Sequence, residues 1–234
     1  MRVVKAGVLG VLVCWSFARQ DETPTFRALG LDDMCAAHII DCMTGTPAKN
    51  YITKPLNADT WADFERLVED NNGVWGGCWC MWYHGKEEAE APAAAKRKAK
   101  QCRVREGRAH AALVFDGDAC VGWAQFGTPD ELPRIHNARA YLKDQPTLPD
   151  WRVTCFFSGK GYRGKGVASA ALDGAIEQIK ALGGGRIEGY PEDIEGRKAS
   201  PAFLFNGALS TFERFGFQRS RKIGKHKWVV TLTV

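Results

Sequence analysis

Apolar residues recur along this chain with two different spacings, and these spacings predict helices and strands from about residue 51 onwards. From Trp61 the apolar positions follow helical spacing after a plausible cap at residues 57–60, which predicts a helix. Two apolar runs on either side of residues 116–118 predict a β-hairpin over 111–126. The run from Arg152 to Ser158 predicts an apolar strand.

The second half of the chain continues this alternation. Apolar residues at helical spacing predict an amphipathic helix over 167–182, which the glycines at 183–185 end. A short strand over 186–190, a helix over 208–215 and a final pair of strands complete the pattern. We therefore expect one domain over residues 51–234, preceded by an N-terminal extension over residues 1–50.

The extension begins with a feature typical of a secretory signal. A short basic start is followed by an apolar run that ends near residue 18, and the run is too short to span a bilayer as a helix. A buried N-terminal segment, or a start codon placed too far upstream, would explain the same pattern. Function at a membrane is therefore not expected.

Composition narrows the class of protein further. A hydrophobic fraction of 45% and a charged fraction of 25% are enough for a packed core, whereas a net charge of +5 is too small to indicate nucleic-acid binding. The basic segment that ends near Arg108 lacks aromatic stacking residues, so we interpret it as a solvated helix or loop. The 8 cysteines have irregular spacings in a chain too long for a disulfide-stapled scaffold.

The segment from Val74 to His84 is dense in tryptophan and cysteine. Cys78, Cys80 and His84 could be metal ligands, but a structural zinc site needs four convergent ligands and no second matching pair follows. We expect no metal here. The segment is predicted to pack on the core or to line a pocket.

A glycine-rich, basic loop lies between the strand at 152–158 and the helix at 167–182. Such a loop before a helix N-terminus is a recurring phosphate site. Gly159, Gly161 and Gly164 fit a dinucleotide fingerprint, with Glu188 as the ribose-binding acid of an NAD-linked oxidoreductase. The antiparallel hairpin before the loop and the short chain after Glu188 count against this alternative. A Walker A motif also fits, except that Gly166 replaces the hydroxyl residue that holds magnesium.

A third pattern, Arg163-x-x-Gly166-x-Ala168, resembles the pyrophosphate loop of the GNAT superfamily of acetyl-CoA-dependent N-acyltransferases. The segment from Leu209 to Phe217 resembles the late helix of the same family, and the two motifs have the right order and separation. The resemblance covers about residues 51–234. It implies an α/β (α+β) fold: a central mixed, mostly antiparallel twisted sheet flanked by helices. It also implies acetyl-CoA as co-substrate and no metal.

The resemblance assigns residues to coenzyme A. The strand end would take the pantetheine arm and the thioester, the loop and helix start would bind the pyrophosphate, and a buried amide would contact the arm. These positions are Phe156, Phe157, Ser158, Lys160, Arg163, Gly164, Lys165, Gly166, Val167, Ala168 and Asn206.

Catalysis in this family needs a neutral amine and a proton for the leaving thiolate. Glu188 is our candidate base, with Glu192, Asp193 and Glu195 as alternatives or as groups that attract a cationic substrate. The family often has tyrosine at the position of Phe212, which cannot donate a proton. Tyr190, Ser210, Thr211 or a water molecule could supply it, or the thiolate could leave unassisted. A non-catalytic CoA-binding module remains an alternative.

The implied reaction moves an acetyl group to a primary amine of a small molecule or peptide. No nucleic-acid partner is expected, and the chain could be a monomer or a homodimer. Because acetyl-CoA is an intracellular metabolite, we expect a cytoplasmic enzyme, in spite of the signal-like residues 1–18.

Overall fold

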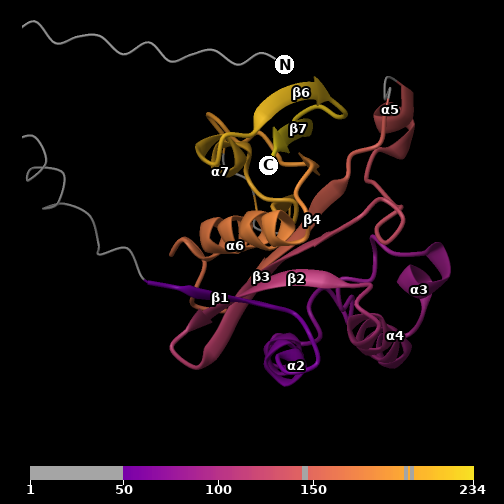
Figure 1. Cartoon of the computed structure of the whole chain (residues 1–234), viewed down its shortest axis with the longest axis vertical. Coiled ribbons are helices and arrows are strands. Elements are labelled where there is room, and N and C mark those ends of the chain that lie inside the picture. Colours follow the sequence, from indigo (N-terminus) through magenta and orange to yellow (C-terminus); the bar gives the residue numbers. More distant parts are fainter. Residues whose placement is uncertain (1–49, 144–146, 198–199, 201–202) are drawn as a thin grey trace, which may run out of the picture. The chain divides into compact units, whose positions relative to one another are not determined.

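The computed structural model describes residues 50–143, 147–197, 200 and 203–234. A seven-stranded sheet in the order β1-β2-β3-β4-β5-β7-β6 forms its centre (Figure 1). Among the described strands, β4 and β5 run parallel and every other neighbouring pair is antiparallel, which confirms the mixed, mostly antiparallel sheet. The strands are β1 (Ile52–Pro55), β2 (His110–Asp116), β3 (Ala119–Gly127), β4 (Trp151–Ser158), β5 (Arg186–Gly189), β6 (Gln218–Lys222) and β7 (Trp228–Thr233).

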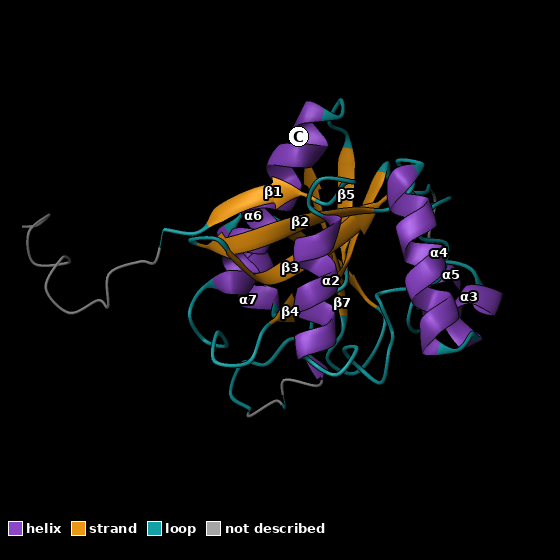
Figure 2. Ribbon diagram, turned by 90° about the horizontal axis from the view of Figure 1, so that it is seen from below, coloured by secondary structure: helices purple, strands orange, loops and turns teal. Residues whose placement is uncertain are grey.

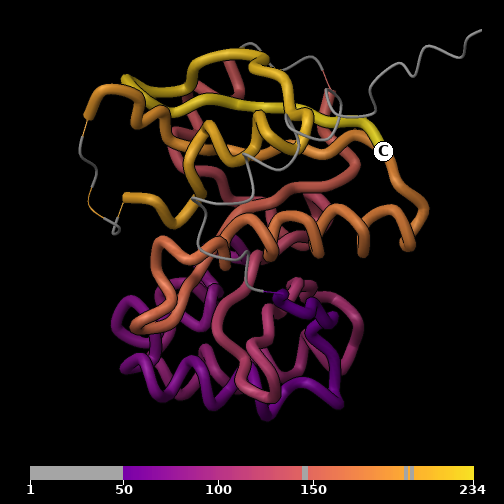
Figure 3. The backbone as a smooth tube through the Cα atoms, turned by 90° about the vertical axis from the view of Figure 1, so that its left-hand side faces the viewer, coloured from indigo at the N-terminus to yellow at the C-terminus, as the bar shows by residue number. Residues whose placement is uncertain are grey.

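Helices cover both faces of the sheet. Helix α6 packs across β1 to β4 on one face and α2 packs on β3 on the other, as Figures 1 and 2 show. In Figure 3 the C-terminal strands (yellow) lie on the side of this domain opposite α2 (indigo). The helices are α2 (Trp61–Asp70), α3 (Lys86–Glu90), α4 (Ala93–Arg105), α5 (Ala138–Lys143), α6 (Val167–Ala181) and α7 (Leu209–Arg214).

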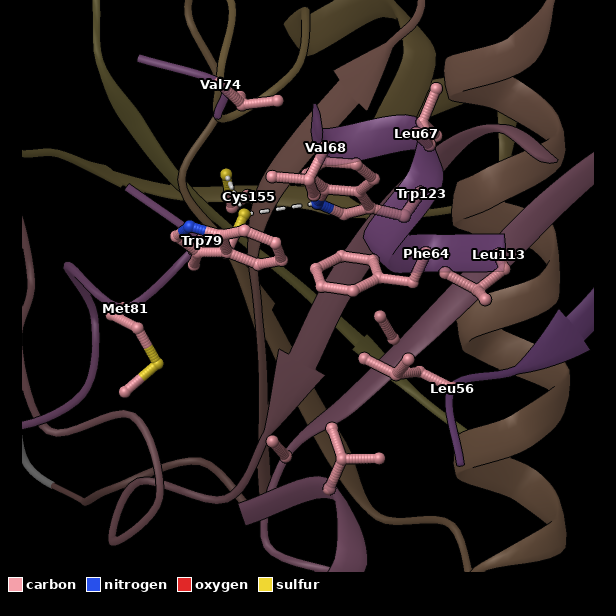
Figure 4. Close-up of a cluster of buried hydrophobic side chains, with 14 of the residues drawn as sticks. Leu56, Phe64, Leu67, Val68, Val74, Trp79, Met81, Leu113, Trp123 and Cys155 are labelled. Atoms are coloured by element: carbon pink, nitrogen blue, oxygen red, sulfur yellow. Dashed lines mark hydrogen bonds between the residues drawn. The ribbon is translucent and has the colours of Figure 1, made fainter. Parts of the chain in front are cut away.

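The alternation of side chains along β2 divides the core into two layers. Leu113 and Phe115 join a cluster under α2, whereas Ala112 and Val114 join a cluster under α6. In the first cluster the ring of Phe64 lies 4.9 Å from Trp123 and 6.2 Å from Trp79, measured between ring centroids (Figure 4). The tryptophan-rich segment therefore packs on the core, as expected.

The sheet splits where β4 and β5 separate. Their parallel pairing runs from Trp151 opposite Ile187 to Val153 opposite Gly189, and β5 ends there while β4 continues to Ser158. Beyond the split, the backbone N–H of Phe156 donates to the carbonyl of Phe205 at 2.7 Å. The end of β4 is thus free of β5 and lies beside a loop from the C-terminal part of the chain.

The expected hairpin is confirmed, with Asp116 paired to Ala119, and so is the helix that begins at Trp61. The basic segment before Arg108 is a helix, α4, but its Lys100 is fully buried rather than solvated. No helix in the described ranges is long and apolar enough to cross a membrane. The signal-like residues 1–18, and the extension apart from Asn50, lie outside the described residues.

Candidate active site

The glycine-rich loop presents unpaired backbone donors at the start of α6. Gly164 and Gly166 have φ values of 72° and 85°, and the N-cap of α6 is Gly166. Among the described residues, no acceptor reaches the N–H groups of Gly164, Gly166, Val167 or Ala168. Aligned N–H groups and the helix dipole favour an anion at this point.

A cavity of about 260 Å³, which we call the loop cavity, lies between this loop and the end of β4. Six of its lining residues are positions that the sequence assigned to coenzyme A. Three of the lining positions come from the end of β4 and three from the loop and the first turn of α6. The lining consists of Trp75, Phe156, Phe157, Ser158, Arg163, Gly164, Ala168, Leu204 and Phe205.

Other positions assigned to coenzyme A do not line this cavity. Lys160 and Lys165 are exposed, and the Lys165 ammonium lies 5.7 Å from the ring centroid of Tyr162. Val167 is buried in the core under α6, against Gly122, where an added Cβ would collide with it. The structure therefore gives Val167 an apolar packing contact and leaves its N–H free.

A second cavity of about 330 Å³, the aromatic cavity, adjoins the first. Both cavities are lined by Trp75 and Phe205. Cys155 of β4 lines the aromatic cavity and its neighbour Phe156 lines the loop cavity. The aromatic cavity is lined by Trp75, Cys78, Cys80, Trp82, Tyr83, Ala89, Lys96, His136, Cys155 and Phe205.

His136 and Tyr83 are the groups of this cavity best suited to proton transfer. The His136 ring is parallel to the ring of Trp82, with 3.7 Å between centroids. Desolvation, together with the charges of Lys227 and Arg134, lowers the pKa of His136 to about 4, so the imidazole is neutral at pH 7. Burial raises the pKa of Tyr83 well above its usual value, so its hydroxyl keeps its proton.

Asn206 is fully buried, and its amide joins three parts of the chain. Its Nδ2 donates to the Thr154 carbonyl and, at 2.6 Å, to the Tyr83 hydroxyl, while its Oδ1 accepts from Lys227 Nζ at 2.9 Å. The amide therefore attaches the Phe205 loop to β4 and holds the hydroxyl of Tyr83, a lining residue of the aromatic cavity.

Glu188 lies in the core at the end of β5 and lines neither cavity. Its Oε2 accepts from the hydroxyls of Tyr141 at 2.8 Å and Tyr190 at 3.1 Å. Burial raises the pKa of Tyr190 well above its usual value, so this hydroxyl stays protonated. The carboxylate is thus held by two tyrosines, with Arg186 Nη1 3.9 Å from Oε1.

The remaining predicted residues are separated from the two cavities. Ser210 is exposed on α7 and lines a different hollow with Asp193 and Glu195. Phe212 is fully buried with its ring edge-on to Phe156, at 5.7 Å between centroids. Glu192 pairs with Lys227 Nζ at 3.2 Å. The acids at 192–195 are not among the lining residues of the aromatic cavity.

The sequence did not predict several residues of the aromatic cavity as site residues, notably His136, Cys155 and Phe205. The one signal was the tryptophan-rich segment, which contributes Trp75 and Trp82. His84, the third possible metal ligand, is fully buried, with Nδ1 2.8 Å from the Glu131 carbonyl. Across the described parts of the chain, no cluster of three or more His, Cys, Asp or Glu side chains could hold a metal ion.

Comparison with known proteins identifies the class. The sequence model of the Acetyltransferase (GNAT) family matches residues 61–193, and the chain belongs to this family. It is therefore an N-acetyltransferase whose co-substrate is acetyl-CoA. The curated proteins contain no match to the chain.

Solved structures of acetyltransferases resemble the chain at low identity. The GNAT domain of PAT from S. lividans is 16% identical with a TM-score of 0.47, and the match covers 78% of this chain and 89% of that one. NAA60 from Arabidopsis thaliana, solved with acetyl-CoA, is 11% identical with a TM-score of 0.43, covering 79% and 99%. A histone acetyltransferase HPA2-related protein from Corynebacterium glutamicum is 17% identical with a TM-score of 0.43, covering 77% and 94%.

Proposed function

We propose that this enzyme transfers the acetyl group of acetyl-CoA directly to a primary amine of a small molecule or peptide. Coenzyme A occupies the loop cavity and the amine occupies the aromatic cavity. The observation that supports this assignment is the arrangement of the two cavities, which flank β4 at the split and share Trp75 and Phe205.

Binding of the donor, acetyl-CoA, relies mainly on backbone N–H groups in this proposal. The free N–H groups of Gly164, Gly166, Val167 and Ala168 bind the pyrophosphate, and the guanidinium of Arg163 adds a charge-assisted contact. Lys160 and Lys165 act through their positive charge. The pantetheine arm runs along Phe156 to Ser158 and brings the thioester to the boundary at Phe205.

The lining of the aromatic cavity favours a flat amine as the acceptor. Rings of Trp75, Trp82, Tyr83 and Phe205 surround the aromatic cavity, and stacking on such rings is favourable for an aromatic group. Lys96 is the charged side chain of its described lining, which includes no carboxylate. A polycationic acceptor would find no carboxylate there, so an aromatic amine is the better fit.

The proton transfers fall to two residues of the aromatic cavity. His136, neutral at pH 7, takes the proton of the attacking amine as the new C–N bond forms. The C–S bond then breaks, and the Tyr83 hydroxyl protonates the leaving thiolate of coenzyme A. Glu188 and Tyr190 take no part in these proton transfers; their hydrogen bond fixes the end of β5 at the split.

The test has two arms. Thermal melting is measured with acetyl-CoA, NAD and ATP side by side, and stabilisation by acetyl-CoA alone is expected. Thiol release is then followed over a panel of aromatic amines, aliphatic polyamines and peptides, with aromatic amines expected to react fastest. Stabilisation by NAD and not by acetyl-CoA would refute the donor assignment, and faster polyamine turnover would refute the acceptor class.

A further inference from the structure

Two thiols from distant parts of the chain meet at the wall of the aromatic cavity. Cys80 belongs to the tryptophan-rich segment and Cys155 to β4, and their sulfur atoms are 3.2 Å apart. Both residues are buried, and both line the cavity. A small molecule in the cavity therefore has access to a sulfur pair that is otherwise enclosed by protein.

The two sulfurs have different surroundings. The indole Nε1–H of Trp123 donates to Cys80 Sγ at 3.2 Å, which makes this sulfur an acceptor. The thiol of Cys155, the positive charge of Lys100 and this indole N–H all lower the pKa of Cys80. The same contact, together with burial, raises the pKa of Cys155 well above its usual value. Burial acts against the lowering at Cys80 but does not cancel it, so the pKa values of the two sulfurs are shifted in opposite directions.

Lys100 is a further buried ionisable group that interacts with the sulfur pair. Its side chain is fully buried, and Nζ lies 3.3 Å from Gln125 Oε1 and 3.5 Å from His84 Nε2. Neither partner carries a negative charge, and within the described chain no carboxylate forms an ion pair with Lys100. Burial lowers the pKa of Lys100, and negative charge on the Cys80 or Cys155 sulfur raises it, so a thiolate here would favour the ammonium form of Lys100.

The backbone at Cys80 is also strained. Trp79 and Cys80 have φ values of 51° and 53°, in the left-handed region that non-glycine residues seldom adopt. Such conformations cost free energy and cluster at functional sites. This strained turn holds the Cys80 sulfur against Cys155 and Trp123.

We propose that Cys80 and Cys155 form a redox-active dithiol, with a small hydroperoxide that enters through the aromatic cavity as oxidant. The Cys80 thiolate attacks one peroxide oxygen, the O–O bond breaks, and a sulfenic acid and a hydroxide (or alkoxide) result; the leaving group takes up a proton from solvent, equivalent to the one that Cys80 lost on ionisation, and becomes water (or an alcohol). The Cys155 thiol then attacks the sulfenic sulfur and releases a second water. The two sulfurs lose two electrons to the peroxide and form a disulfide.

The disulfide would alter the acceptor side of the enzyme and leave the donor side unchanged. Its sulfurs move from 3.2 Å to about 2.0 Å apart, which needs only a small shift of the strained turn. The bond ties the tryptophan-rich segment to β4 and removes the negative charge beside Lys100. Because the described lining of the loop cavity contains no sulfur, binding of acetyl-CoA should survive oxidation.

The experiment treats the reduced full-length protein with hydrogen peroxide, blocks free thiols with iodoacetamide, and maps peptides without reduction. The expected product is a cross-linked peptide pair containing Cys80 and Cys155. In Cys155→Ser, dimedone should trap a sulfenic acid on Cys80. In Cys80→Ser, Cys155 should remain a thiol. Because the readout is the covalent state of sulfur, it does not depend on acetyl transfer.

Two further variants test the mechanism against simple proximity. Lys100→Met should slow the oxidation about tenfold, because the thiolate loses its counter-charge. Cys102→Ser, which removes an exposed thiol near Lys100 in the sequence, should leave the rate unchanged. Cys120, partly buried and with a pKa raised to about 12 by burial, serves as an internal standard for an unreactive thiol.

Phenylarsine oxide, which bridges two neighbouring thiols without oxidising them, gives a measurement independent of peroxide chemistry. The reduced wild type should bind one equivalent at this pair, and either serine variant should lose it. A folded wild type that forms no cross-link with excess peroxide, and whose Cys80 reacts no faster than Cys120, would overturn the proposal.

Discussion

The two cavities differ in the parts of the chain that line them and in the kind of group, backbone or side chain, that they present. The loop cavity takes most of its lining from one short stretch, Phe156 to Ala168, and its anion-binding groups are backbone N–H groups that two glycines leave open. The aromatic cavity takes its lining from five separate stretches, around Trp75, Lys96, His136, Cys155 and Phe205, and its chemistry lies in side chains. On the proposed assignment, donor recognition is local in sequence, whereas acceptor recognition depends on the tertiary fold.

Gly166→Glu should have the largest effect of these variants, and it should change acetyl-CoA binding in the loop cavity without changing the aromatic cavity. A Cβ at Gly166 meets nothing closer than 4.0 Å, so the cost to stability is the backbone strain of a side chain at a φ of 85°, and the carboxylate would stand among the groups proposed to bind pyrophosphate. Repulsion of several kcal/mol is expected, which weakens acetyl-CoA binding at least about a hundredfold. Isothermal titration calorimetry with acetyl-CoA measures this affinity.

The control for backbone strain is Gly107→Glu. Gly107 also has a positive φ, 66°, with no atom within 4 Å of an added Cβ, and it lies outside both cavities. This variant should lose a similar stability and keep its affinity for acetyl-CoA. Equal affinity for acetyl-CoA in both folded variants would mean that the loop does not hold the pyrophosphate.

His136→Gln should affect the aromatic cavity alone. Glutamine is polar and similar in reach but cannot take up a proton at neutral pH, and loss of a general base costs about a hundredfold in kcat. The affinity for acetyl-CoA should be unchanged, because His136 does not line the loop cavity. Steady-state kinetics with the best amine of the panel gives kcat, with His226→Gln as the matched control. A wild-type kcat in the His136 variant would exclude it as the base.

Acid should destabilise the aromatic side of the enzyme through two histidines. The pKa is lowered from 6.5 to about 2 for His84, mainly by burial, and to about 4 for His136. Between pH 6.5 and 4 the unfolded chain binds protons at both residues and the folded chain at neither, so stability present above pH 6.5 is lost as the pH falls. Each histidine contributes up to about 1.4 kcal/mol per pH unit.

Urea unfolding at a series of pH values measures this slope. His136→Gln should reduce it by the contribution of one proton, and Gly166→Glu should leave it unchanged, because the described loop cavity contains no histidine. A slope that is the same in wild type and His136→Gln would mean that His136 is already protonated in the folded enzyme.

The sequence allowed a residue-by-residue prediction for the donor side because its signals are local. The spacing of Arg163, Gly166 and Ala168 follows directly from how a loop enters a helix, and the fold class followed from the same resemblance. Lys100 shows the limit: its basic neighbours indicate a solvated helix, yet tertiary packing buries its side chain against Gln125. His136 lies in an irregular segment without periodicity, so no local pattern connects it to Trp82.

Glu188→Gln should have the smallest effect on the rate, and it tests the choice of base directly. The residue was chosen from its place on a strand beside the split, but its side chain faces two tyrosine hydroxyls in the core. Glutamine keeps an acceptor oxygen and loses the charge, so kcat should change less than about threefold while the free energy of unfolding falls by about 1 kcal/mol. Glu213→Gln, in an exposed ion pair with Arg219, is the control. A hundredfold loss of kcat in Glu188→Gln, with a normal rate in His136→Gln, would move the proton transfer from the aromatic cavity to the end of β5.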